Sequence, residues 1–156
     1  LIDTRKAHLH AFVTRDVYVA LPPPPPEVAQ PGMCAKLVRS LYGTRDAPAR
    51  WEALYTETLT GLGFEKGCAS ACCFWHRARG LRCAVHGDDF TFTGCDVDLD
   101  WAPAEMEKAL LCKVSGRLGG GPHDVQEVRL LNRVIRWTPY RVAVRSGPEA
   151  RRAVAA

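Results

Sequence analysis

Long apolar runs are missing from this chain of 156 residues. A membrane-spanning helix needs roughly 18 or more consecutive apolar residues. No stretch approaches that length, so the sequence predicts no transmembrane helix and no membrane partner. No secretory signal peptide is visible, because charged side chains interrupt the first residues at Asp3, Arg5 and Lys6. No internal repeat is visible either, which argues against a repeat array.

Paired cysteine motifs are also missing, although the chain has seven cysteines. An odd number of cysteines without secretory features predicts reduced thiols in a cell interior. Cys68, Cys72, Cys73 and His76 are close in sequence, but they lack the C-x2-C spacing of a zinc site, and residues 73–75 have the composition of a strand. We therefore expect buried thiols here rather than zinc.

A complete calcium-binding loop is not present. Asp96, Asp98 and Asp100 alternate after Gly94, but the glycine and glutamate that complete the loop pattern do not follow. We therefore predict an acidic loop without a bound cation, and a helix that begins after it at Pro103, since proline is favoured in a first helical turn.

The chain does contain enough apolar material for a core. Apolar residues make up 47% and charged residues 24% of the sequence, which suits one folded domain rather than a disordered chain. Lys and Arg number 21 against 17 Asp and Glu, which gives a formal charge of +4. This mild excess suits a nucleic-acid partner without requiring one.

Hydrophobic periodicity predicts an α+β fold. A helix is expected after Asp46, because Pro48 suits its first turn and apolar residues follow at helical spacing from Trp51 as far as Gly61. The predicted strands are residues 16–21, 72–76, 81–85 and 90–93, with a further pair inside 127–137. This order favours helices on one face of a mainly antiparallel sheet.

Two segments fall outside this pattern. Residues 22–26 are five consecutive prolines, which lack backbone donors and predict an exposed polyproline II loop. A rigid connector is the favoured role for this loop, and binding of a protein partner is the alternative. Residues 138–156 form a basic tail that we predict to be frayed or disordered.

Residues 83–94 are the stretch around which the other elements are organised. Two β-prone runs flank the His-Gly-Asp-Asp sequence at 86–89, and Gly87 permits a tight turn, so we predict a hairpin with two adjacent carboxylates at its tip. Aspartates in turns commonly bond to their own backbone. Alternatively, the pair belongs to a magnesium site, which requires a further carboxylate. Asp3, at the end of a short strand, is a candidate.

Four short stretches stand out in a fixed order. They are residues 3–9 (D-T-R-K-A-H-L), 16–19 (D-V-Y-V) followed by the prolines, 36–51 (K-L-V-R-S-L-Y-G-T-R-D-A-P-A-R-W) and 86–96 (H-G-D-D-F-T-F-T-G-C-D). They resemble the D-V-K-T-A-F-L, E-V-Y-M-x-Q-P-P, K-L-x-K-S-L-Y-G-L-K-Q-A-P-R-x-W and Y-V-D-D…T-G-x-D motifs of the reverse transcriptases of Ty1/copia-type retrotransposons. Order and spacing agree over residues 1–137.

The resemblance implies a polymerase palm, which is a ferredoxin-like antiparallel sheet with helices on one face, together with partial fingers over residues 1–137. It implies Asp3, Asp88 and Asp89 as the catalytic acids that hold two Mg²⁺ ions. The implied reaction is RNA-directed DNA polymerisation, in which a primer end attacks a deoxynucleoside triphosphate. The implied partners are an RNA or DNA template with its primer, and the implied location is the cytoplasm or nucleus.

By position, the resemblance places Ala7, His8 and Asp46 in the nucleotide pocket, where the chain departs from the motifs. His8 replaces the aromatic residue that excludes a 2′-hydroxyl group. Asp46 replaces a glutamine and brings a negative charge near the triphosphate, unless Arg45 or a metal offsets it. His and Gly also replace the Tyr and Val before the two acids. For these reasons we expect weak or no activity from the isolated chain.

Two other interpretations stay open. The first is a decayed retrotransposon remnant that keeps its fold and binds nucleic acid weakly without catalysis; the substitutions favour it and the three retained acids disfavour it. The second is a protein-interaction domain that uses the proline run as its ligand. Binding to a primer–template that weakens with salt would argue against the second interpretation, because docking of a proline loop on a protein does not compete with nucleic acid.

Overall fold

The computed structural model describes residues 1–21, 33–139 and 141–146. The chain divides into two compact units, of which the larger is Asp3–Lys113 and the smaller combines Leu1–Ile2 with Val114–Ala156. The predicted proline loop at 22–26 lies outside the described residues. Within the described residues, no helix is both long and apolar enough to cross a membrane.

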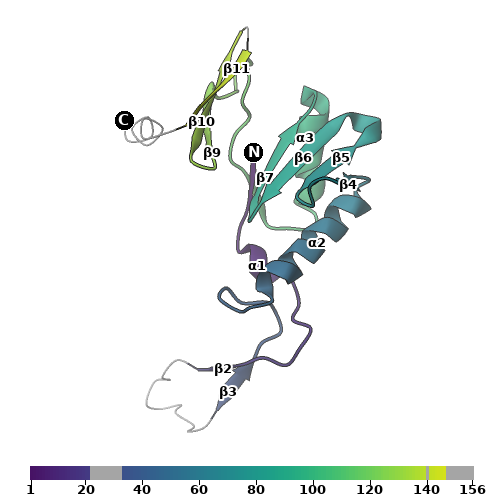
Figure 1. Ribbon diagram of the computed structural model, residues 1–156, viewed down its shortest axis with the longest axis vertical. Helices are drawn as coiled ribbons and strands as arrows, with labels where there is room; N and C mark the ends of the chain where they lie inside the picture. Colours follow the sequence, from purple (N-terminus) through teal and green to yellow (C-terminus); the bar gives the residue numbers. More distant parts are fainter. Residues whose placement is uncertain (22–32, 140, 147–156) are drawn as a thin grey trace. The chain divides into compact units, whose positions relative to one another are not determined.

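The larger unit mixes helices with antiparallel strands, which confirms the predicted α+β class (Figure 1). Its helices are α1 (Ala7–His10), α2 (Ala47–Gly61), the 3-10 turn η2 (Arg77–Arg79) and α3 (Asp96–Met106). Its strands are β1 (Ile2–Thr4), β2 (Tyr18–Ala20), β3 (Cys34–Lys36), β4 (Glu65–Lys66), β5 (Cys73–His76), β6 (Leu81–His86), β7 (Asp89–Thr93) and β8 (Cys112–Val114). Strands β2 and β3 form a separate two-stranded ribbon.

Six strands form the main sheet in the order β4-β5-β6-β7-β1-β8. Strand β6 alternates strictly between buried and exposed residues, with Leu81, Cys83 and Val85 buried. Successive side chains of a strand point to opposite faces, so one face of this sheet is the core and the other carries the exposed residues of β6.

Helix α2 covers the core face with a stripe of aromatic side chains. The rings of Trp51 and Tyr55 lie edge-on to Phe90 of β7, with centroids 6.2 and 5.8 Å apart, and Tyr55 also contacts Phe74 of β5 at 6.1 Å. Such edge-to-face pairs contribute about 0.5–1.5 kcal/mol each beyond the area they bury. The predicted helix and its inward stripe are confirmed.

Helix α3 corrects the prediction for the acidic segment. The helix begins at Asp96, not at Pro103, and Asp96 and Asp98 lie in its first turn. Acidic side chains are stabilising there because the unpaired N–H groups carry partial positive charge. Hydrogen bonds from the Cys95 thiol and then from Arg79 lower the pKa of Asp98. The segment predicted as an acidic loop is therefore the first turn of a helix, and Pro103 lies within that helix.

The expectation of buried thiols was wrong for Cys68, Cys72 and Cys73. Cys68 and Cys72 are exposed in the loop, and Cys73 is exposed because it points away from the core face. Only Cys83 is fully buried among the seven free cysteines, and burial raises its pKa far above the ordinary thiol value.

The smaller unit contains a three-stranded antiparallel sheet in the order β11-β10-β9. Strands β9 (Glu127–Leu130) and β10 (Arg133–Thr138) are the predicted pair, joined by Leu131 and Asn132 in the left-handed region. Strand β11 (Arg141–Ser146) pairs with β10 along its length, so this part of the predicted frayed tail is ordered. Residues 147–156 lie outside the described residues, and a domain limit at 137 stays a prediction.

Trp51 provides a direct test of the packing. Its indole Nε1 donates a hydrogen bond to the Gly87 carbonyl at 2.7 Å. Trp51→Phe removes this donor and leaves the carbonyl unpaired, so we expect the free energy of unfolding to fall by about 1–3 kcal/mol, measured by urea denaturation. Trp75→Phe is the matched control; its side chain is exposed, and we expect a change within about 0.5 kcal/mol. Equal losses in both variants would contradict the assignment.

Candidate active site

The His-Gly-Asp-Asp segment forms the predicted hairpin turn. His86 pairs with Asp89 in the β6–β7 register, which leaves Gly87 and Asp88 as a two-residue loop. Gly87 has a φ angle of 63°, in the left-handed region that suits the first loop position of hairpins of this length. The glycine therefore fits the predicted turn.

Strand β1 brings Asp3 to this hairpin. It is the neighbour of β7 in the sheet, and the Thr4 amide donates to the Asp88 carbonyl at 2.9 Å. Ile2 and Thr4 are buried, so Asp3 between them points to the opposite face. Asp89 alternates with buried Phe90 in the same way. The structure thus brings Asp3 and Asp89 to one end of the sheet face opposite α2, which we call the helix-free face, with Asp88 in the adjoining loop.

The electrostatics of Asp89 show that these acids interact. Burial raises the pKa of Asp89, and the negative charges of Asp88 and Asp3 raise it further, while His86 lowers it. Like charges raise a carboxyl pKa only at short range, and a divalent cation relieves that repulsion. Carboxylate oxygens are the ligands that Mg²⁺ prefers, so the donor chemistry fits. Within residues 1–21, 33–139 and 141–146, no three or more His, Cys, Asp or Glu side chains are arranged as a metal site.

The three residues predicted for the nucleotide pocket lie in α1 and just before α2. Ala7 is buried in α1, and His8 stacks on Tyr42 with ring centroids 4.4 Å apart and planes tilted by 32°. Helix α1 packs against α2, and Asp46 is the residue that precedes α2. No described contact joins His8 to Asp46 directly. Tyr42 belongs to this cluster although the sequence did not single it out as a site residue.

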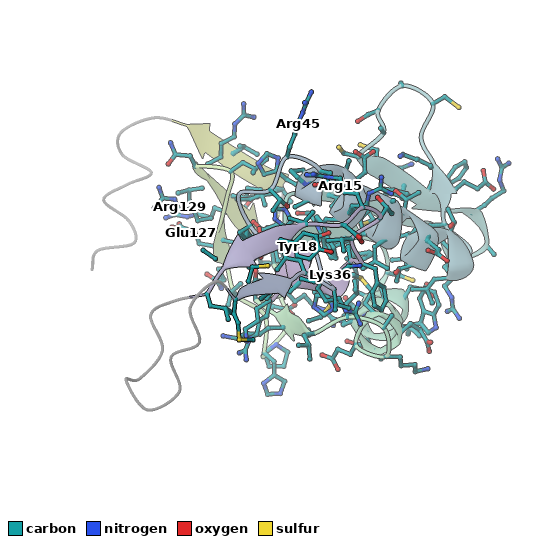
Figure 2. The ribbon with its side chains drawn as sticks, turned by 90° about the horizontal axis from the view of Figure 1, so that it is seen from below. Arg15, Tyr18, Lys36, Arg45, Glu127 and Arg129 are labelled. Atoms are coloured by element: carbon teal, nitrogen blue, oxygen red, sulfur yellow. The ribbon has the colours of Figure 1, made fainter. Side chains whose placement is uncertain are left out.

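The charge of Asp46 is offset by Arg15, a residue that the sequence interpretation missed. Arg15 donates to both carboxylate oxygens, Nε to Oδ2 at 3.3 Å and Nη2 to Oδ1 at 3.1 Å. These bonds are the main cause of the lowered pKa of Asp46. Figure 2 shows Arg45, which was expected in this role, pointing away from the body of the molecule. The two partners lie 31 residues apart, and no sequence signal links them.

Among the residues that the structure describes, two buried nitrogens in this region have no hydrogen-bond partner. They are Nδ1 of His8 and Nε of Arg50, which lies one turn into α2. Buried polar atoms are nearly always paired in native proteins. A hydroxyl-bearing or anionic ligand beside α1 and α2 would supply hydrogen-bond partners for these nitrogens.

Comparison with known proteins identifies the family of this chain. The family model described as "Reverse transcriptase (RNA-dependent DNA polymerase)" matches residues 1–110. The chain belongs to this family. It is 30% identical over 100 residues to the "Retrovirus-related Pol polyprotein from transposon RE1" of Arabidopsis thaliana, an alignment that covers 63% of this chain and 7% of that polyprotein. The copia-type resemblance is thereby confirmed. No solved structure matches.

The chain thus spans a small part of the length of the polyprotein that it matches. The matched segment contains all three acids, both helices of the nucleotide region and the β6–β7 hairpin. It ends before the three-stranded sheet of the smaller unit.

Asp89→Asn tests the repulsion among the acids. Because the pKa of Asp89 is raised by folding, the free energy of unfolding falls as the pH rises from the unfolded value of 3.8 through the folded pKa. The variant removes this loss. We therefore expect its free energy of unfolding at neutral pH to exceed that of the unmodified chain by about 0.5 kcal/mol, after allowing for solvent screening. This gain in the free energy of unfolding disappears at about pH 3, below the pKa of Asp89 in both the folded and the unfolded state. Destabilisation at neutral pH would contradict the assignment.

Arg15→Ala tests the ion pair at α2. Without the guanidinium, the pKa of Asp46 should rise toward its ordinary value of 3.8, as followed by the carboxyl carbon in an NMR pH titration. Arg45→Ala removes the same charge from a neighbouring position and should leave the pKa of Asp46 nearly unchanged. Equal shifts in both variants would assign the effect to general charge rather than to the pair.

Proposed function

We propose that this chain carries the catalytic palm and part of the fingers of an RNA-directed DNA polymerase that uses two-metal nucleotidyl transfer. Family membership supports a reverse-transcriptase function in general terms. The observation that carries the specific proposal is the convergence of acids 3, 88 and 89 on one end of the helix-free face, with the raised pKa of Asp89 as its electrostatic signature.

The proposed roles follow from the position of each acid. Asp3 and Asp88 would hold two Mg²⁺ ions, and Asp89 would complete the acidic cluster. Bound there, the metals would lower the pKa of the primer 3′-hydroxyl and neutralise the triphosphate. The protein's own contribution is to fix the carboxylates, since β1 and the β6–β7 turn are joined by the Thr4–Asp88 hydrogen bond.

The proposed nucleotide pocket lies at α1 and the start of α2. His8, held against Tyr42, would face the sugar, and its partnerless Nδ1 gives it a polar edge that a phenyl ring lacks. Asp46, neutralised by Arg15, would no longer repel the triphosphate. Nε of Arg50 is a buried donor suited to a phosphate oxygen.

The proposed partners are an RNA or DNA template with its primer and deoxynucleoside triphosphates. Backbone charge contacts supply most non-specific affinity for nucleic acid, and a formal charge of +4 supplies few. We therefore expect the chain alone to extend a primer weakly or not at all, and we expect its parent to act inside the cell, in the cytoplasm or nucleus.

Primer extension on an RNA template with Mg²⁺ tests this function. The chain, a version extended at both ends, and Asp88→Ala and Asp89→Ala variants of each are compared. We expect extension by the longer version to fall at least about a hundredfold in both variants, because the charge developing at the transferred phosphate loses its metal ligands. The matched control is Glu57→Gln, which changes an exposed acid on α2 and should not alter the rate.

Each outcome separates the candidate functions. If only the longer version extends the primer, the short chain binds the nucleic acid too weakly for the reaction. Extension that survives loss of both acids would rule out the proposed metal site. If neither version extends the primer, the decayed-remnant interpretation is favoured.

A further inference from the structure

The helix-free face of the main sheet also carries a groove, at β5, β6 and β7. Its volume is about 380 Å³, within the range of small-ligand sites. Every residue that lines it belongs to the unit Asp3–Lys113, so the groove is a feature of that unit alone. Helices α2 and α3 both lie on the other face, where Phe64 contacts Phe92 of β7 and Trp101 of α3.

A row of three side chains crosses the groove from strand to strand. Trp75 of β5 pairs in register with Arg82 of β6, and Arg82 pairs with Thr93 of β7. Register partners on one face stand about 5 Å apart. The side chains of Trp75, Arg82 and Thr93 therefore leave neighbouring strands on the same face, and all three residues are exposed.

Trp75 is the unusual member of this row. It is 41% exposed, although a large aromatic side chain gains most by burial. The guanidinium of Arg77 lies 4.8 Å from its ring centroid. The tryptophan is thus a flat platform held from one side by a cation, which suits stacking of another planar group.

The lining of the groove is mostly apolar, and Arg82 is its only charged residue. No carboxylate is among its lining residues. Arg77 is partly neutralised by Glu65 at 3.5 Å, whereas Arg82 takes part in none of the ion pairs identified among the described residues. A ligand that fits must therefore combine a planar aromatic group with a negative charge. A nucleotide unit of a single strand has both, and such strands are bound by aromatic platforms flanked by cations.

The groove also lies in line with the acids. Asp89, Thr91 and Thr93 alternate along the same face of β7. Four residues of strand at about 3.3 Å each place Thr93 roughly 13 Å from Asp89. A strand whose end reaches the acids can therefore extend to the groove without leaving the sheet.

We propose that this groove is a second contact for single-stranded nucleic acid, with a base stacked on Trp75 and a phosphate bound by Arg82. The inference rests on the proposed function in one respect, the nature of the ligand. It adds a binding site that requires neither the acids nor a metal.

The test is binding of a short fluorescein-labelled oligothymidylate to the full chain, followed by anisotropy in the absence of divalent metal. We expect Trp75→Ala to weaken binding about tenfold, the effect of losing one stacked base, and Trp75→Phe to retain most of the affinity. Arg82→Ala should weaken binding and reduce the slope of log affinity against log salt by about 0.7, the value for one phosphate contact on a single strand.

Lys108→Ala is the matched control, because it removes an exposed cation that follows α3 and does not line the groove. It should leave the slope unchanged. Equal effects of Arg82→Ala and Lys108→Ala, no loss in the Trp75 variants, or no binding by the unmodified chain would each overturn the proposal. So would an apolar dye that binds at Trp75 while the oligonucleotide does not.

Asp89→Asn separates this proposal from catalysis. Binding that depends on Trp75 and Arg82 and survives in Asp89→Asn, without primer extension by any version of the chain, supports the groove and counts against the proposed polymerase. The opposite outcome is primer extension by the longer version while oligonucleotide binding is unchanged in the Trp75 and Arg82 variants. This outcome supports the proposed polymerase and contradicts the proposed role of the groove.

Discussion

The hydrogen bond from the Trp51 indole to the Gly87 carbonyl is the contact on which the acidic site depends. It joins α2 to the two-residue loop of the hairpin. On the other side of the loop, the Thr4 amide donates to the carbonyl of Asp88. Both carbonyls of the turn are therefore occupied, one by the helix and one by β1. The acids are held at a fixed place because the backbone beneath them is held from two sides.

This contact explains in physical terms the spacing of the Ala-Pro…Trp stretch. Pro48 is compatible with the first turn of α2, and Ala47 is fully buried, so the helix start can lie close against its neighbours. Trp51 follows one turn later, on the face that meets the hairpin. Gly94 has a comparable role at the end of β7, where a Cβ atom would collide with the side chain of Leu81.

Local signals predicted the parts of this site that local physics determines. The hairpin, α2 and the pairing of strands in 127–137 follow from periodicity and turn chemistry, and the acids at 3, 88 and 89 meet because their strands neighbour each other. Three features could not be predicted in this way. The Arg15–Asp46 pair joins distant segments, the start of α3 depends on how Asp96 and Asp98 complement the helix end, and the exposure of Cys73 depends on which face of β5 is covered.

His86 shows how a substitution redistributes charge at the turn. It is the register partner of Asp89, and its positive form lowers the pKa that burial and the neighbouring acids raise. A tyrosine at this place supplies no such charge. A proton on His86 and a divalent metal on the acids are two cations that relieve the same repulsion, so they oppose each other.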